Sequence, residues 1–259
     1  MAYDYEYFKD EINKMTKINL SDYKEKQMKR RIDTLIQKNK IVGYDKYVAA
    51  LKTDKALFEE FINYITINVS EFYRNPDQWK IMDEKVFPDL VQRFGKRLKI
   101  WSAACSTGDE PYSLVMALSK HVPLSDIRIQ ATDLDQVILS KAKLGLYADK
   151  SIVGVPAEFK TKYFEKVGTS YRIKDEIKTH VNFSKHNLLL DKYDTGYNMI
   201  VCRNVLIYFT EEAKDEVFRK FFNSLLPGGY LFIGSTEQIM NYKEIGFERI
   251  SSFYYQKPM

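Results

Sequence analysis

The sequence predicts an α/β protein with a doubly wound, mostly parallel sheet, preceded by a small all-helical domain. Residues 1–75 contain no proline and a single glycine, and their apolar residues recur at helical spacing. From Leu98 onward, short apolar segments of strand length alternate with helical segments, which is typical of βαβ units. We therefore expect a helical N-terminal domain over 1–75 and a sheet domain over 76–259.

The helical domain is predicted to contain amphipathic helices over 23–39 and 55–68. In the first helix the apolar residues fall on one stripe: Met28, Ile32, Leu35 and Ile36. The same region is basic, because seven bases stand against two acids between Lys24 and Lys40, an excess equal to the net charge of +5 of the whole chain. A local excess of this kind favours an acidic partner. The bases that helical spacing places away from the apolar stripe are Lys26, Lys29, Arg30 and Lys40.

The sheet domain should contain five main strands and three long helices. The expected strands cover 98–104, 127–133, 180–187, 197–204 and 230–235. The expected helices cover 110–120, 136–147 and 211–226, and strand-like residues 247–257 close the chain. Residues 148–179 interrupt the alternation. We expect an inserted antiparallel subdomain at about 148–183, with a hairpin over 168–183.

Composition excludes several classes of protein. Hydrophobic residues make up 45% of the chain, which suffices for a packed core. No apolar run approaches the roughly 20 residues of a membrane-spanning helix, and the N-terminus has no signal-peptide pattern. Cys105 and Cys202 are too few for a disulfide framework and are expected to be buried, reduced thiols, which indicates a cytoplasmic protein. The three histidines lack metal-ligand spacing, so we expect no metal site.

The turn after the first predicted strand, within KIWSAACSTGDEPYSL (99–114), indicates the kind of ligand. It contains small residues but only one glycine, Gly108, so it lacks the glycine-rich pattern of phosphate-binding loops. Asp109 and Glu110 follow, and they would repel a phosphate and attract a cation. Asp133, at the end of the second strand, could accept hydrogen bonds from ribose hydroxyls, or it could only cap the next helix. A ribose without phosphate, together with a cationic group, indicates S-adenosylmethionine.

Five motifs then occur in a fixed order along the chain. They are NVSEFYRNPDQW (68–79), IWSAACSTGDEPYSLVM (100–116), ATDLD (131–135), HNLL (186–189) and VCRNVLIYF (201–209). Together they resemble the CheR family, chemotaxis methyltransferases that esterify glutamate side chains of receptors. The resemblance covers nearly the whole chain and implies a Rossmann-like, class I S-adenosylmethionine-dependent methyltransferase fold.

The resemblance also implies roles for individual residues. Arg74 would clamp the methionyl carboxylate, because a guanidinium pairs with a carboxylate through two hydrogen bonds; the alternative is a solvated surface arginine. Glu110 would contact the ammonium group of the cofactor, and Asp133 its ribose. The family often has threonine where Ser70 stands, and serine keeps the hydroxyl. The remaining cofactor contacts implied by the resemblance are Asn68, Ser70, Asn187, Leu188, Arg203 and Asn204.

The implied reaction needs no general base, because a glutamate side chain has a pKa of about 4.3 and is already ionised at neutral pH. The enzyme's task is then to hold the reacting groups in line. Tyr208, after the fourth strand, and Arg74 are the candidates to orient the acceptor oxygen; Tyr208 as one more core aromatic residue is the alternative.

The partners implied by the resemblance are the cytoplasmic helical domains of methyl-accepting chemotaxis receptors. They would dock on the basic face defined above, for which a merely solvated helix face is the alternative. In some family members the insertion binds a C-terminal receptor peptide, and the sequence leaves open whether it does so here.

Two rival functions use the same fold. A nucleic-acid methyltransferase could track phosphates with the basic helix, but the Asn-Pro-Pro-aromatic turn common in base amino-methylation is replaced here by RNVLIY. A non-catalytic S-adenosylmethionine sensor is the other rival, and the combination of acidic cofactor contacts with an open acceptor end argues against it. We therefore expect no nucleic-acid partner and no direct membrane insertion.

Overall fold

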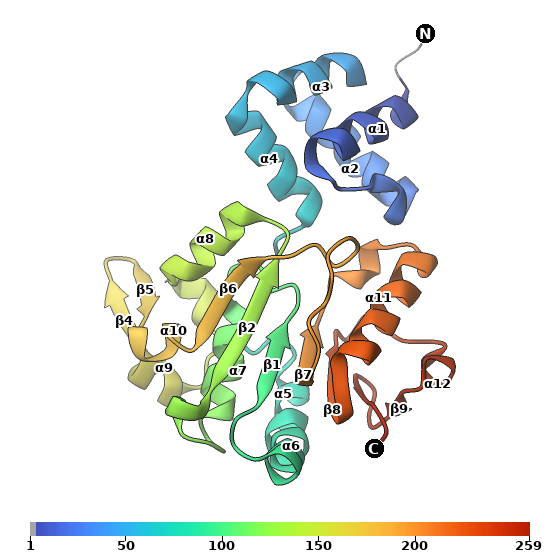
Figure 1. Ribbon diagram of the computed structural model, residues 1–259. Coiled ribbons are helices and arrows are strands. Elements are labelled where there is room, and N and C mark those ends of the chain that lie inside the picture. Colours follow the sequence, from blue (N-terminus) through green and yellow to red (C-terminus); the bar gives the residue numbers. More distant parts are fainter. Residues whose placement is uncertain (1–3) are drawn as a thin grey trace. The chain divides into compact units, whose positions relative to one another are not determined.

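The computed structural model describes residues 4–259, which pack as two compact units (Figure 1). The first unit comprises the chain up to Asn68 together with the segment Leu206–Glu216. The second comprises Val69–Val205 and Val217–Met259. The helical unit thus ends earlier than residue 75, and it includes a short segment from the sheet half of the sequence.

The first unit is built on four helices, whose bounds are α1 (Tyr5–Thr16), α2 (Glu25–Lys38), α3 (Tyr44–Thr53) and α4 (Lys55–Thr66). Asp4 and Asp54 cap α1 and α4 by accepting hydrogen bonds from backbone N–H groups of the first turn. The predicted apolar stripe of α2 is confirmed, since all four of its residues are buried. The helix expected over 55–68 ends at Thr66, because Ile67 adopts the left-handed conformation.

The second unit contains the predicted doubly wound sheet, with strand order β6-β2-β1-β7-β8-β10-β9. The five strands from β6 to β8 run parallel, and β10 and β9 add antiparallel at one edge. Their bounds are β1 (Lys99–Ser102), β2 (Arg128–Asp133), β6 (Val181–Lys185), β7 (Tyr197–Cys202), β8 (Leu225–Ile233), β9 (Glu248–Arg249) and β10 (Tyr254–Gln256). The predicted fold class is confirmed.

Alternate residues of the central strands are buried on opposite faces of the sheet. Ile100 and Val201 belong to a core cluster that includes Leu114, whereas the Trp101 ring packs against Phe221 with centroids 5.6 Å apart. Both faces are therefore covered, by helices that include α7 on one side and α11 on the other. The helices of this unit are α5 (Pro76–Ile81), α6 (Phe87–Phe94), α7 (Asp109–Leu118), α8 (Gln136–Leu144), α11 (Glu211–Ser224, whose first residues belong to the other unit) and α12 (Tyr242–Ile245).

The insertion forms a separate three-stranded antiparallel sheet, with order β3-β5-β4. Its elements are β3 (Leu146–Ala148), α9 (Ala157–Tyr163), β4 (Phe164–Val167), β5 (Ser170–Ile173) and α10 (Asp175–Lys178). The hairpin predicted over 168–183 was misplaced. Gly168, with φ +61°, permits a two-residue turn that pairs Val167 with Ser170, so the hairpin covers 164–173, and Val181 already belongs to the main sheet.

Three further boundaries differ from expectation. The helix expected over 136–147 ends at Leu144, because Gly145 adopts a left-handed φ of +66° and β3 starts directly after it. The strand expected over 230–235 starts at Leu225 instead, and α11 ends at Ser224 rather than at 226. A register shift against β7 between Tyr197 and Met199 accommodates Pro227 and its two glycines within β8.

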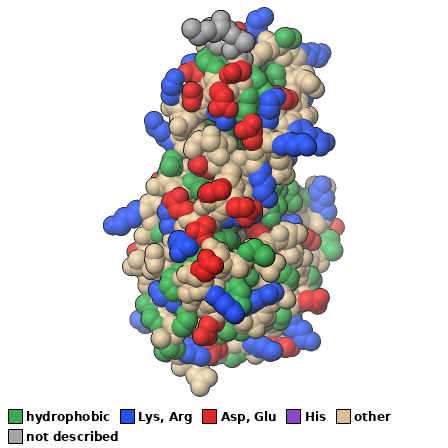
Figure 2. Space-filling model, turned by 90° about the vertical axis from the view of Figure 1, so that its right-hand side faces the viewer, with side chains coloured by type: hydrophobic (Ala, Val, Ile, Leu, Met, Phe, Trp, Pro, Cys, Tyr) green, Lys and Arg blue, Asp and Glu red, His purple; other side chains and the backbone are tan. Residues whose placement is uncertain are grey.

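The described residues contain no helix that is long and apolar enough to cross a membrane. On the face shown in Figure 2, Lys and Arg side chains are interspersed with Asp and Glu side chains. The modest net charge is thus not gathered into one field of a single sign on this face.

Candidate active site

A pocket in the second unit lies where β1 and β7 end, at the carboxyl edge of the sheet. Its lining includes Ala104, which follows β1, and Arg203, which follows β7. In open parallel sheets this edge is where ligands bind. The full lining is Val69, Ser70, Glu71, Arg74, Ala104, Ser106, Glu110, Arg203 and Asn204.

The turn between β1 and α7 is tight, as predicted. The Gly108 N–H donates to the Cys105 carbonyl at 2.9 Å, and Gly108 has φ +88° at the start of α7. A side chain there would come within 3.1 Å of both Ala142 and Tyr112, so space as well as backbone conformation requires glycine. Ser106 is also left-handed, with φ +46°, which is a strained conformation for a serine.

Asp133 fixes this turn. Its Oδ2 accepts a hydrogen bond from the Ser106 N–H at 2.8 Å, and its Oδ1 accepts one from the Asp135 N–H at 3.0 Å. The N-cap of α8 is Asp135, whose carboxylate accepts from Val137 and Ile138. The alternative role for Asp133, as the helix cap, is therefore wrong. Burial raises the pKa of Asp133, and its hydrogen bonds oppose that rise.

Two more acids at the start of α7 are largely removed from water. Glu110 accepts a hydrogen bond from the Ser102 hydroxyl at 2.8 Å, and its Oε2 lies 3.6 Å from Arg203 Nη1. Burial raises the pKa of Glu110, and Arg203 opposes that rise. Burial also raises the pKa of Asp109, which is 1% exposed; the hydroxyls of Thr107 and Ser70 oppose the rise. Of the acids whose pKa is raised, only Glu110 lines the pocket, while Asp109 and Asp133 are not among its lining residues. An acid with a raised pKa in a pocket marks a candidate functional site.

The guanidinium groups of the two arginines of the pocket differ in their hydrogen bonding. Arg203 is buried, and its Nη2 donates to the Arg74 carbonyl at 2.7 Å and to Asn75 and Gln78 at 3.0 Å each. Arg203 thus holds the 74–78 turn next to Glu110. The guanidinium of Arg74 has no hydrogen bond or ion pair with any residue from 4 to 259, and it lines the pocket half-buried. Arg74 is therefore available to an anionic group.

Sequence reasoning missed Glu237, which holds the turn after β7. Its Oε2 accepts from the N–H groups of Asn204 at 2.8 Å and Gly234 at 2.7 Å, and its Oε1 accepts from Val205 at 3.1 Å. Asn204 has φ +59°, so this clamp stabilises a left-handed residue that lines the pocket. An acid shortly after the strand ending at Ile233 was the available signal, but its partners are distant in sequence.

Three buried polar side-chain atoms of the pocket residues have no hydrogen-bond partner within the part of the chain that the structure describes: Ser106 Oγ, Arg203 Nε and Asn204 Oδ1. Such atoms are rare in folded proteins unless a ligand or water satisfies them. Together with the Glu110 carboxylate and the Arg74 guanidinium, these atoms give the pocket hydrogen-bond donors, hydrogen-bond acceptors and groups of both charges. This donor set fits S-adenosylmethionine, which carries an ammonium, a carboxylate and a ribose.

Other predicted residues lie elsewhere. Asn187 and Leu188 follow β6 and do not line this pocket; the Asn187 carboxamide oxygen accepts from the Leu189 N–H at 2.9 Å, and Leu188 is buried. Asn68 and Tyr208 belong to the first unit, as do the basic residues of α2. Both cysteines are buried free thiols whose pKa is raised by burial, which confirms their structural character.

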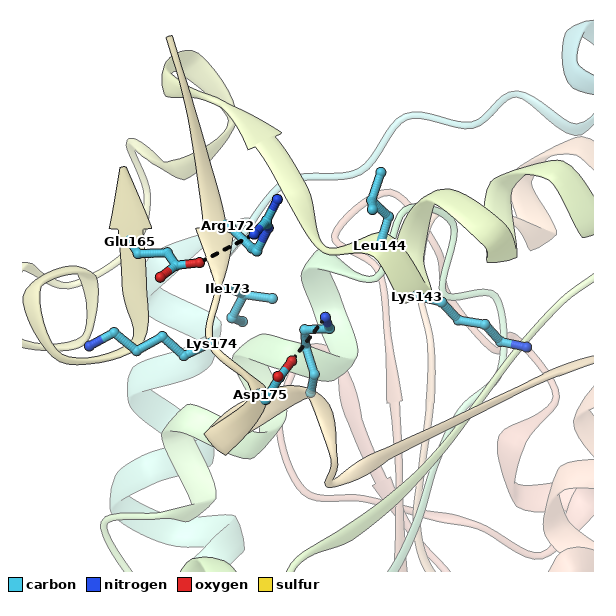
Figure 3. Close-up of a pocket in the computed structure, with 8 residues that line it drawn as sticks. Lys143, Leu144, Glu165, Arg172, Ile173, Lys174 and Asp175 are labelled. Atoms are coloured by element: carbon cyan, nitrogen blue, oxygen red, sulfur yellow. Dashed lines mark ion pairs between the residues drawn. The ribbon is translucent and has the colours of Figure 1, made fainter. Parts of the chain in front are cut away.

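A second pocket lies in the insertion, between the end of α8, the β4–β5 hairpin and α10 (Figure 3). Two ion pairs line it: Arg172 lies 3.6 Å from Glu165, and Lys178 lies 3.1 Å from Asp175. In Figure 3 the side chains of Lys143 and Lys174 extend away from these pairs. The lining contains four bases and two acids.

The doubly wound sheet and the acidic pocket at its carboxyl edge define a class I S-adenosylmethionine-dependent methyltransferase domain. Residues 68–255 match the family model described as CheR methyltransferase, SAM binding domain, and residues 3–66 match CheR methyltransferase, all-alpha domain. The chain belongs to the CheR methyltransferase family.

Full-length relatives agree with this assignment. A "Chemotaxis protein methyltransferase" of Listeria innocua is 41% identical over 254 residues, covering 98% of this chain and 97% of the relative. "Chemotaxis protein methyltransferase 1" of Pseudomonas aeruginosa is 33% identical, covering 92% and 91%. Among solved structures, a TehB-like SAM-dependent methyltransferase from Corynebacterium glutamicum aligns with 70% of this chain and 92% of its own, at 14% identity and a TM-score of 0.39.

Proposed function

We propose that this protein transfers a methyl group from S-adenosylmethionine to glutamate side chains of chemotaxis receptors, forming methyl esters. The observation that carries the proposal is the pocket that combines the largely buried Glu110, the turn held by Asp133, and the guanidinium of Arg74, which has no hydrogen bond or ion pair within residues 4–259. Family membership and the names of the relatives support a chemotaxis methyltransferase. The family description and these names do not state the acceptor, so glutamate as the acceptor is our own step in this proposal.

Different residues of the second unit would contact different groups of the cofactor. Glu110 would hold the ammonium, and Asp133 the ribose hydroxyls, because each of its oxygens accepts one backbone N–H and has capacity for another bond. Arg74 would pair with the methionyl carboxylate. Ser70, Arg203 and Asn204 line the same pocket and complete its wall. For Asn68, Asn187 and Leu188 the proposal rests on the family resemblance alone.

The chemistry asks for positioning rather than proton transfer. Bound S-adenosylmethionine supplies a methyl group on a positively charged sulfur. A glutamate acceptor is ionised at neutral pH, so no residue has to remove a proton. Tyr208 would orient the acceptor oxygen, with Arg74 as a second candidate, and alignment of this kind can lower a barrier by several kcal/mol.

The docking face of the proposal is the exposed side of α2 and the residue that follows it. Lys26, Arg30 and Lys40 are exposed, and their side chains have no ion pair within residues 4–259. Lys29 is used differently: it lies 2.8 Å from Asp33 and near the rings of Tyr5 and Tyr44. We therefore assign attraction of an acidic receptor helix mainly to the first three residues.

Labelling with methyl-tritiated S-adenosylmethionine tests the proposal. The protein is incubated with receptor cytoplasmic domains or, separately, with RNA. We expect base-labile label on the receptor, since carboxyl methyl esters hydrolyse in base. Label on RNA would favour the nucleic-acid methyltransferase, and cofactor binding without any transfer would favour the sensor.

A further inference from the structure

The segment that carries Tyr208 is paired with the start of the helical domain. The Lys24 N–H donates to the Tyr208 carbonyl at 2.9 Å, and the Thr210 N–H donates to the Asp22 carbonyl at 2.9 Å. Tyr23 and Phe209 form an isolated antiparallel bridge between these two bonds. The backbone of Tyr208 is thus fixed on its C-terminal side by residues far from it in sequence.

The side chains reinforce this bridge. The rings of Tyr23 and Phe209 meet edge to face, with centroids 5.0 Å apart and planes at 88°. This is a preferred geometry for aromatic pairs. Phe209 is buried, and its N–H closes the short 3-10 turn Leu206–Tyr208 through the Leu206 carbonyl at 3.1 Å. The turn before Tyr208 and the bridge after it leave its main chain little freedom.

From these contacts we infer that Tyr23 is a positioning residue for Tyr208: through Phe209 it fixes the backbone that presents the Tyr208 side chain to the acceptor. The inference rests on the proposed function. Lys24 is also the residue that precedes α2, so the docking helix and Tyr208 are joined within one compact unit. An acceptor helix bound to α2 would therefore meet Tyr208 in a defined register.

A double-mutant cycle between Tyr23 and Tyr208 tests the inference. We expect Tyr23→Ala to lower kcat for receptor methylation by about tenfold, because misplaced positioning groups reduce rates steeply. The affinity for S-adenosylhomocysteine should not change, and Tyr23→Phe, which keeps the ring, should retain the parent kcat. In a Tyr208→Phe background, Tyr23→Ala should lower kcat further by less than about twofold, because coupled residues are not additive.

Controls separate this role from loss of stability. Tyr7→Ala removes an aromatic ring that is not part of the bridge, from α1, and should leave kcat unchanged. If Tyr23→Ala does not fold, Phe209→Leu enters the same cycle. An equal fall of kcat in both backgrounds, or no fall at all, would overturn the inference. Absence of receptor methylation by the parent protein would instead refute the proposed function.

Discussion

The carboxylate of Asp133 accepts a hydrogen bond from the backbone N–H of Ser106 at 2.8 Å, and this bond ties the end of β2 to the turn after β1. This bond holds the strained backbone of Ser106, whose hydroxyl has no hydrogen-bond partner among residues 4–259 and which lines the same pocket as Glu110. The geometry of the pocket thus depends on a bond between the end of β2 and the turn that follows β1, the neighbour of β2 in the sheet.

Asp133→Ala should weaken S-adenosylhomocysteine binding by roughly 1–3 kcal/mol, the cost of leaving polar partners unpaired. Isothermal titration calorimetry measures this. The matched control is Asp135→Ala, which removes the cap of α8 and should lower stability by about 1 kcal/mol without changing affinity. Equal affinities of the Asp133 variant and the parent would refute the ribose assignment.

Arg74→Lys should weaken cofactor binding by about tenfold, because lysine keeps the charge but lacks the planar fork that pairs with a carboxylate. Arg93→Lys is the control, since Arg93 pairs with Asp89 on α6 rather than lining the pocket. Fluorescence or calorimetric titration with S-adenosylhomocysteine gives the comparison. A lysine variant with parental affinity and rate would rule out the clamp.

The raised pKa of Glu110 predicts how cofactor binding depends on pH. Its pKa lies above that of an ordinary glutamate because it is buried, and only its ionised form attracts the ammonium group of the cofactor. Affinity should therefore fall as pH decreases through this raised pKa, at a higher pH than the usual value of about 4.3. Glu110→Gln should bind weakly and lose this pH dependence. An affinity profile that the substitution leaves intact would contradict the assignment.

Glu237→Gln should destabilise the protein by roughly 1–3 kcal/mol, because the amide cannot accept from all three backbone N–H groups that the carboxylate satisfies. It should also weaken cofactor binding, since the Asn204 turn lines the pocket. Urea unfolding and calorimetry test the two effects. Glu244→Gln, on the exposed side of α12, is the control and should match the parent.

Reversing two charges on α2, Lys26→Glu with Arg30→Glu, should raise KM for receptor and flatten the salt dependence of methylation, because exposed charges act over about 8 Å at physiological ionic strength. Cofactor affinity should stay unchanged. Lys29 is left intact, since a glutamate there would face Asp33.

The matched control for this double substitution is Lys85→Glu with Lys96→Glu, two exposed lysines of the second unit, which changes the net charge equally. If the α2 variant methylates receptor like this control at low and high salt, the basic face is only solvated. The basic pocket of the insertion would then be the next surface to test.

Much of the fold could be predicted because its signals are local. The buried strand β7 is apolar except for Asn198, and the apolar stripe of α2 follows helical spacing. The errors arose where contacts between residues far apart in the sequence determine the secondary structure. Pro227 and its glycines read as a helix end, yet pairing with β7 includes them in a strand. Gly168 forms the turn of the hairpin and is visible in the sequence. The pairing of Val181 with Ile129 in the main sheet could not be deduced from the neighbouring residues in the sequence.

The site divides in the same way. Glu110 and Asp133 could be proposed because charge and position near strand ends are visible in the sequence, and Arg74 because it matches a motif of the family. The roles of Glu237 and Arg203 depend on hydrogen bonds to residues roughly 30 and more than 100 positions away, which no periodicity reveals. The same holds for Tyr23, whose partner Phe209 lies in the other half of the chain.

The central claim, methyl transfer to glutamate side chains, is tested most directly by tandem mass spectrometry of a receptor cytoplasmic domain after incubation with S-adenosylmethionine and this protein. We predict methyl esters on glutamate side chains of the helical receptor segment, absent when the protein is omitted and strongly reduced with the Arg74→Lys variant. Methyl groups found on lysine, arginine or a chain terminus, or an unmodified receptor alongside intact cofactor binding, would contradict the account.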